Sequence, residues 1–106
     1  MSAAHPDVRW EAQVGRDTRF RRLDHEAVVF NPESGETQLL TAVAAAVLEA
    51  LRRSPATPGE LIPAVTALLS AEASSADVLV RVCEILDELN RLGLARPCLG
   101  VRDAAR

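Results

Sequence analysis

The hydrophobic pattern of the chain changes its period near residue 40, and this change limits the folds that the chain can adopt. Residues 18–23, 27–30 and 37–40 are rich in β-branched and aromatic residues or alternate apolar with polar ones, as strands do. From Leu40 to Leu51 the apolar residues instead recur at steps of three and four, the spacing of one helix face. Strands followed by helices predict an α+β domain.

Two further features belong to the strand-forming half. The segment Asn31-Pro32-Glu33-Ser34-Gly35 combines the fixed φ of proline with a glycine that tolerates positive φ, which predicts a hairpin between the last two strands. Residues 8–14 alternate apolar and polar side chains with a period of two. They predict an additional strand at the start of the chain.

Three helices are expected after the strands. The first spans about 42–53, with Thr41 as its N-cap and two arginines at its C-terminal end. The second begins at a capping box formed by Thr57 and Glu60. Pro63 lies past its first turn and predicts a kink or a late start. The apolar face predicted for this helix consists of Leu61, Val65, Leu68 and Leu69.

The third helix is predicted to be the longest. Ser74 and Asp77 supply its start signal, and Gly93 supplies the residue type that ends helices in the left-handed conformation. Leu94 is placed to contact Leu89 in that motif. The segment after residue 95 contains turn residues and predicts a short edge strand or disorder. The apolar stripe of the helix consists of Val78, Leu79, Val82, Ile85, Leu86, Leu89 and Leu92.

Size and composition favour one domain without catalytic machinery. The 106 residues, 48% of them hydrophobic, suffice for one core over about residues 18–96, and we expect 1–7 and 97–106 to be flexible. No signal peptide or membrane span is apparent, so a cytoplasmic protein without membrane contact is expected. Dispersed glycines, two isolated histidines and two cysteines predict no nucleotide loop, no metal site, no cofactor and no enzyme. Both thiols are expected to be reduced, with a packing role for Cys83 and none assigned to Cys98.

The charge distribution bears on nucleic acid as a partner. A net charge of −3 and mixed charges on the third helix disfavour binding to a phosphate backbone. Arg16, Arg19, Arg21 and Arg22 form the main basic concentration. They fit either contact with an acidic partner or the protection of an exposed edge strand against aggregation.

Four segments resemble the PqqD-like family of small peptide chaperones, and the order of elements matches over about residues 18–96. Within that family, Trp10 and the run Ser34–Leu40 resemble the branch associated with HPr kinase-related proteins, the HPr-rel-A system. The segments that carry the resemblance are Phe30–Thr41, Ala44–Leu48, Thr57–Leu61 and Leu89–Leu94.

The resemblance implies a winged helix-turn-helix fold, with a small three-stranded antiparallel sheet followed by three helices. It also implies a function as a recognition element for ribosomally made precursor peptides, in which the leader peptide adds a strand and is presented to a modifying enzyme, here an HPr kinase-related one. By position, the peptide-binding residues are Glu36, Thr37, Gln38, Leu39 and Leu40 on the last strand and Val78, Arg81, Val82 and Ile85 on the third helix. Strand addition gives sequence-tolerant affinity through main-chain hydrogen bonds.

Two alternatives from other classes stay open at this point. A winged helix also reads duplex DNA, and the N-terminal arginines offer phosphate contacts. A structural subunit or a homodimer formed by pairing of strand edges is the other alternative. The sequence names neither the peptide, the enzyme nor the final product.

Overall fold

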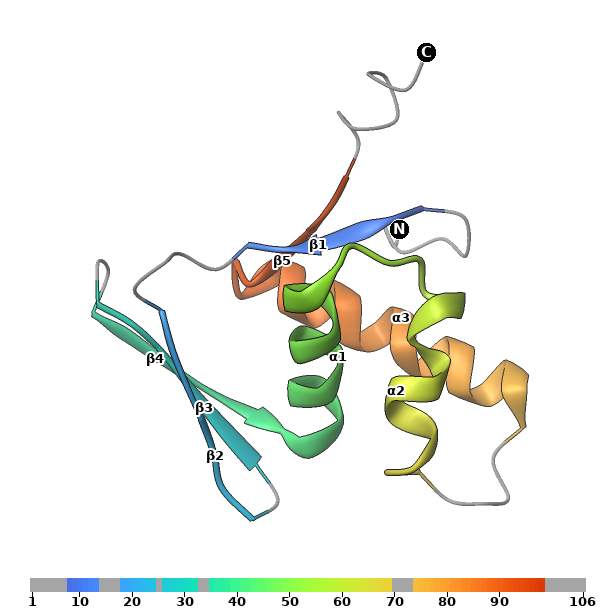
Figure 1. Ribbon diagram of the computed structural model, residues 1–106, viewed down its shortest axis with the longest axis horizontal. Helices are drawn as coiled ribbons and strands as arrows, with labels where there is room; N and C mark the ends of the chain where they lie inside the picture. Colours follow the sequence, from blue (N-terminus) through green and yellow to red (C-terminus); the bar gives the residue numbers. More distant parts are fainter. Residues whose placement is uncertain (1–7, 14–17, 25, 33–34, 70–73, 99–106) are drawn as a thin grey trace.

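The fold is that of a computed structural model, which describes residues 8–13, 18–24, 26–32, 35–69 and 74–98 (Figure 1). It is an α+β domain in which a three-stranded antiparallel sheet precedes three helices, as predicted. Among the described residues, no helix is long and apolar enough to span a membrane. The elements are β1 (Trp10–Ala12), β2 (Arg19–Arg22), β3 (Glu26–Asn31), β4 (Glu36–Thr41), α1 (Ala42–Arg53), the 3-10 turn η1 (Gly59–Leu61), α2 (Ile62–Thr66), α3 (Ser75–Arg91) and β5 (Ala95–Pro97).

The three-stranded sheet has the order β2-β3-β4 and consists of two consecutive hairpins. In the second hairpin the amide of Gly35 donates to the carbonyl of Asn31 at 2.8 Å, and Gly35 has a φ of 76°. A side chain at this position would be strained, because L-residues rarely adopt positive φ. The predicted hairpin is therefore confirmed, and it sets the register in which Gln38 lies opposite Val29.

The additional N-terminal strand exists, but it does not join this sheet. β1 pairs antiparallel with β5, so that Trp10 lies opposite Pro97. On its other side Trp10 exchanges two backbone hydrogen bonds with Ala56, at 2.7 and 3.0 Å. The Trp10 side chain is fully buried in the core. The segment after residue 95 thus forms a short strand as far as Pro97, and Cys98, for which no role was predicted, is buried beside it.

α1 begins and ends where the sequence predicts. The Thr41 hydroxyl accepts a hydrogen bond from the Ala44 amide at 3.1 Å, which satisfies a backbone donor that the first helical turn leaves free. Arg52 and Arg53 lie in the last turn, where positive charge stabilises the helix dipole. Thr41 is both the last residue of β4 and the N-cap of α1, so no loop separates β4 from α1.

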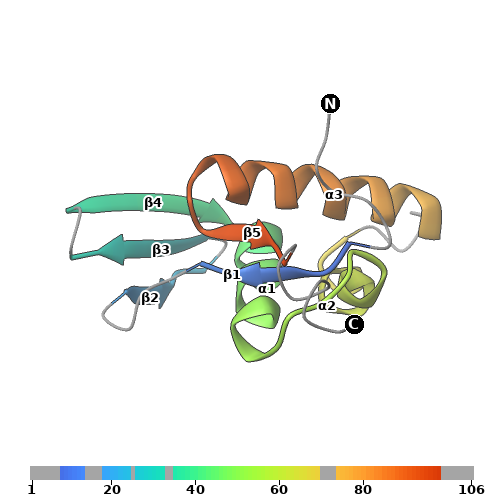
Figure 2. The same cartoon turned by 90° about the horizontal axis from the view of Figure 1, so that it is seen from above.

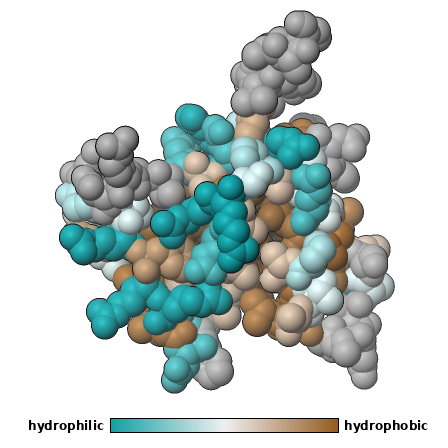
Figure 3. Space-filling model, viewed as in Figure 1, coloured by the Kyte–Doolittle hydropathy of each residue, from teal (hydrophilic) through white to brown (hydrophobic). Residues whose placement is uncertain are grey.

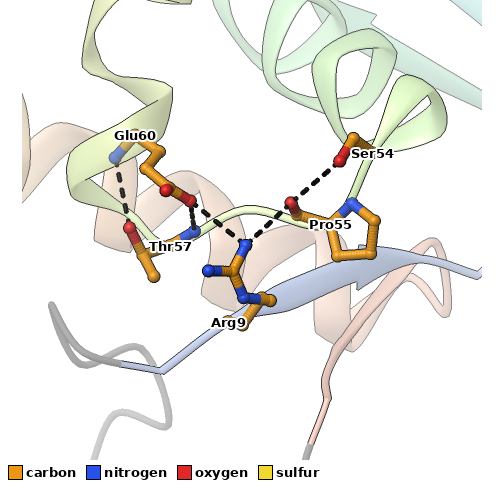
Figure 4. A network of polar contacts seen from close by, with 5 residues as sticks. All are labelled: Arg9, Ser54, Pro55, Thr57 and Glu60. Carbon is orange, nitrogen blue, oxygen red and sulfur yellow. Dashed lines mark hydrogen bonds and ion pairs between the residues drawn. The ribbon is translucent and has the colours of Figure 1, made fainter. Parts of the chain in front are cut away.

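The predicted capping box forms at the start of the second helical segment. The Thr57 amide donates to the Glu60 carboxylate at 2.9 Å, and the Glu60 amide donates to the Thr57 hydroxyl at 3.3 Å. Figure 4 shows that Arg9 reaches the same place, donating to Glu60 at 3.3 Å and to the Pro55 carbonyl at 3.1 Å. The hydrogen bond from the Thr57 amide is the main cause that lowers the pKa of Glu60. These contacts join the start of β1 to the turn before α2.

α2 has the late start expected from Pro63. A 3-10 turn occupies residues 59–61, and the α-helix begins only at Ile62, so that Pro63 falls in the first turn, where its missing amide is tolerated. The helix is also short. The prediction that Leu68 lies on its buried face is wrong, because α2 ends at Thr66 and the Leu68 side chain is 45% exposed.

α3 has the predicted caps at both ends. The Ser74 hydroxyl accepts from the Asp77 amide at 3.1 Å. At the other end Gly93 has a φ of 78°, and the amide of Leu94 donates to the carbonyl of Leu89 at 2.8 Å. This hydrogen bond, with that from Gly93 to Asn90 at 3.0 Å, is the Schellman arrangement.

One core holds the elements together. Residues from both sheets and all three helices contribute to it, including Trp10, Val29, Leu48, Val65 and Leu89. In Figures 1 and 2 the β2-β3-β4 sheet projects from the helical body like a wing, whereas the β1-β5 ribbon lies against the helices. The wing therefore has one face toward α1 and one face away from the helices.

Candidate functional site

The outer edge of β4 is an open strand edge within the part of the chain that the structure describes. β4 pairs with β3 on one side and with no described strand on the other. Figure 2 shows this open edge on the side of the molecule where α3 lies. An unpaired edge presents a row of backbone donors and acceptors to a further strand.

The alternation of hydrogen bonds in the sheet identifies the residues whose backbone groups point outward. Leu23 donates to the carbonyl of Glu26 at 2.7 Å, so this pair is a hydrogen-bonded one. Hydrogen-bonded and non-hydrogen-bonded pairs alternate along an antiparallel ladder. Phe20 and Val29 lie three pairs further along from Leu23 and Glu26, so they form a non-hydrogen-bonded pair. Val29 therefore directs its backbone to the other side, toward Gln38 on β4. Thr37 and Leu39, the neighbours of Gln38 on β4, then direct their amides and carbonyls to the open edge.

The side chains of β4 divide between the two faces of the sheet. Leu40 is 3% exposed and faces the core, and Gln38, two residues earlier on the same face, is half-buried. Leu39 faces the other way and is 61% exposed, which is unusual for a large apolar side chain. A strand added beside β4 thus meets a mixed polar and apolar face on the core side and Leu39 on the outer side.

A small pocket lies at the hairpin end of the core-facing side. It has a volume of about 40 Å³, and its walls come from the segments before β2, from β3 and β4, and from the end of α3. We call it the polar pocket, because Gln13, Thr18, Asn31, Glu36 and Gln38 line it together with Val29 and the turn Leu92–Leu94. The pocket brings the first half of β4 together with the C-terminal end of α3.

The α3 residues predicted to bind peptide have different exposures. Val78, Val82 and Ile85 are buried, whereas Arg81 is exposed and pairs with Glu84 at 3.4 Å. Steps of 3.6 residues per turn place Val78, Arg81 and Ile85 close to the line of Leu92 on the helix surface, with Val82 further round. In Figure 1 the C-terminal end of α3 lies nearest to the sheet and its N-terminal end lies farthest away.

Sequence reasoning did not identify the polar pocket. Gln13 and Leu92 line it together with Gln38, although they belong to segments far apart in the chain. The sequence did point to Leu92, because it is the last residue of the apolar stripe of α3 and comes directly before Gly93. It did not point to Gln13, since the position of Gln13 follows from the pairing of β1 with β5, and its amide donates to the carbonyl of Leu94 at 2.7 Å.

The N-terminal arginines form no single cluster in the described residues. Arg22 pairs with Glu49 of α1 at 2.9 Å, and Arg19 and Arg21 lie exposed on β2, the other edge strand of the sheet. Arg16 lies outside the described residues. This arrangement favours the interpretation that charge protects an exposed edge.

The two cysteines and the acidic side chains are candidates for a second site within the described part of the chain. Burial raises the pKa of the thiols of Cys83 and Cys98, with smaller contributions from Asp87 and Glu11 respectively, so both thiols stay protonated at neutral pH. Within the described ranges, no group of three histidine, cysteine, aspartate or glutamate side chains is placed to hold a metal ion.

A second hollow, of about 290 Å³, lies between α1 and α2, and Ala50, Ala67 and Leu68 are among the residues that line it. In Figure 3, which looks onto this side, hydrophilic side chains gather over α1 and hydrophobic ones toward α2. Helices bond their own backbone groups internally, so this hollow has no open backbone edge to offer.

The comparison with known families shows which family the chain matches. The family described as Coenzyme PQQ synthesis protein D (PqqD) matches residues 26–95, a range that begins at β3 and includes β4, the three helices and the first residue of β5. No curated protein and no solved structure shows significant similarity to the chain.

Proposed function

Because the chain belongs to the PqqD family, whose members are non-catalytic peptide-binding recognition elements of ribosomally made peptides, we propose that it captures the leader of a precursor peptide as an additional strand along β4. The captured peptide is then presented to a separate modifying enzyme. An HPr kinase-related enzyme is the specific candidate that the sequence suggests. The peptide lies beside residues 36–41 and against the α3 face that carries Arg81 and Ile85.

The open edge of β4 is the observation that supports this proposal. Thr37 and Leu39 direct backbone groups away from β3, so a guest strand gains main-chain hydrogen bonds without displacing any described strand. Each such hydrogen bond contributes about 0.5–1.5 kcal/mol, and several together give an affinity that depends little on side chains. The adjoining α3 face then adds selectivity.

The position of the edge also suits presentation. β4 is held at both ends. The hairpin to β3 fixes its start, and the Thr41 cap of α1 fixes its end. A rigid edge loses little conformational entropy on binding. The guest remains reachable from the solvent side, because it is the outermost strand.

The test uses peptides enriched on the protein from a displayed random dodecapeptide library, with the full chain labelled with ¹⁵N. Capture along β4 predicts chemical-shift changes concentrated at residues 36–41 and on the α3 face that carries Arg81 and Ile85. Shifts confined to Arg19–Arg22 would contradict the proposal. Salt-sensitive retention of duplex DNA without peptide-induced shifts would favour a winged-helix DNA-binding protein instead.

A pair of substitutions at Leu39 separates backbone from side-chain contributions. The Leu39 amide faces the open edge, so Leu39→Pro removes a donor to the guest while leaving the ladder to β3 intact. We expect Leu39→Pro to weaken binding of an enriched peptide about tenfold or more, measured by fluorescence anisotropy. Leu39→Ala, which keeps the amide, is the matched control and should weaken binding less. Equal losses in both variants would exclude strand addition at this position.

A further inference from the structure

The polar pocket lies where a guest strand on β4 directs one of its side chains. In a sheet, residues directly opposite each other on neighbouring strands project to the same face. The guest residue opposite Gln38 therefore projects to the core-facing side, where Gln38 lines the polar pocket. For a guest that runs antiparallel to β4, this position is also a non-hydrogen-bonded pair, in which the two side chains approach most closely, because the backbone of Gln38 faces β3.

The walls of the pocket offer both hydrogen-bond donors and acceptors. The side-chain amides of Gln13 and Gln38 form no hydrogen bond with other described residues, and each carries a carbonyl oxygen and an NH₂ group. Glu36 lines the same wall and adds carboxylate oxygens to it. Leu92, partly buried, forms an apolar side of the pocket.

The size of the pocket limits the group that it can hold. A water molecule needs about 10–15 Å³ of such volume, so about 40 Å³ holds roughly three water-sized groups. That is the size of a carboxamide or of a hydroxyl-bearing carbon. A long aliphatic or aromatic side chain exceeds this volume and would leave the two glutamine amides without partners.

The neighbouring positions of β4 favour different guest residues. Two residues along the same face, the guest residue beside Leu40 meets a buried apolar side chain. On the opposite face, the guest residue beside Leu39 meets an exposed one. Among the described positions of β4, those of Gln38 and, two residues earlier on the same face, Glu36 line the polar pocket, whereas those of Leu39 and Leu40 present apolar side chains.

The geometry points to the polar pocket as a specificity site for the guest peptide, which takes one small neutral hydrogen-bonding side chain, asparagine, serine or threonine, at the position opposite Gln38. This inference rests on the capture function proposed above and adds to it a requirement on the peptide sequence. Peptides with this residue are favoured over those with a large apolar residue there, since the latter desolvate the amides without satisfying them.

The experiment compares selections from the displayed random dodecapeptide library on four full-length proteins: wild type, Gln38→Leu, Gln13→Leu and the control Thr66→Val. On wild type, enriched peptides should share one position at which asparagine, serine and threonine are enriched at least about tenfold over leucine and phenylalanine. Both glutamine variants should lose that preference, because they replace an amide wall with an apolar one. Thr66→Val makes a comparable change at an exposed position at the end of α2, outside β4 and the pocket, and should keep it.

The outcomes separate this inference from the function on which it rests. Enriched peptides without a shared polar position, or a polar preference unchanged in both glutamine variants, overturn the specificity site while leaving peptide capture intact. A wild-type protein that enriches no peptide overturns the capture function, and the specificity site with it. Gln13→Leu lies outside the sheet, so it gives a result even where Gln38→Leu fails to fold by circular dichroism.

Discussion

β1 and β4 are both short strands, but their backbone edges are used differently. β1 pairs with β5 on one side, and on the other its Trp10 exchanges hydrogen bonds of 2.7 and 3.0 Å with Ala56. β4 pairs with β3 alone among the described residues. The side chains follow the same division, since Trp10 is 0% exposed and Leu39 is 61% exposed.

The difference shows how a small domain separates stability from binding. Closing both sides of β1 uses the chain's own backbone and joins the N-terminal segment to the turn before α2 and to the end of α3. Leaving one side of β4 open costs little, because the water-exposed groups of an edge strand remain solvated. The closed strand thus belongs to the core and the open strand to the proposed binding site.

The largest expected contrast is in amide hydrogen exchange of the free protein. The Trp10 amide is buried and hydrogen-bonded, so it should exchange on the order of a thousandfold more slowly than the outward-facing Leu39 amide, relative to intrinsic rates. Exchange measured by NMR with and without an enriched peptide checks this. Protection of Leu39 should rise on binding, and a Leu39 amide already as protected as that of Trp10 would show that the β4 edge is closed.

Substitution in the two strands should affect folding stability unequally. Trp10→Ala empties a fully buried site and should lower the free energy of unfolding by about 3–5 kcal/mol. Leu39→Ala removes a mostly exposed side chain and should change it by less than about 0.5 kcal/mol. Urea unfolding followed by circular dichroism measures both, because Trp10 is the only tryptophan and fluorescence is lost with it. A cost of similar size at both positions would contradict the division between a closed and an open strand.

The smallest expected effect concerns the contacts that hold the closed side of β1. The Thr57 amide and, to a lesser extent, Arg9 lower the pKa of Glu60 below its ordinary value of 4.5. The ionised carboxylate therefore contributes stability that is fully present above pH 4.5 and is lost as the pH falls through the lowered pKa. Glu60→Gln keeps the capping geometry but not the charge, so wild type should exceed it in stability at pH 6 and lose that advantage toward pH 3. A stability difference that stays constant over this range of pH would exclude the charge of the Glu60 carboxylate as its source.

Local signals predicted most of the fold because each element carries its own start or stop residues. Thr41 caps α1, Ser74 caps α3, and Gly93 ends α3 in the left-handed conformation, all as expected from the sequence. The prediction was wrong where the spacing of apolar residues continues past the end of the helix. Leu68 fits the helical spacing of Leu61 and Val65, but α2 ends at Thr66 before that spacing can bury it.

The candidate site was predicted in part. The resemblance indicated β4 and residues 78–85 of α3, whereas the polar pocket brings β4 together with Leu92–Leu94 at the end of α3. The sequence alone gave no means of finding Gln13 there, because a polar residue after a short strand has no periodic signal. Nor did it distinguish the outward-facing backbone of Thr37 and Leu39 from the inward-facing backbone of Gln38.

By itself, the sequence determined the order of the elements, their caps and the hairpin between β3 and β4, since these depend on neighbouring residues and on the period of the side chains. Only the tertiary structure decided which strand edges close and which stay open. Strand pairing joins segments that are distant in the chain, such as β1 with β5 and Trp10 with Ala56. No pattern of neighbouring residues predicts which of these segments pack together in the core.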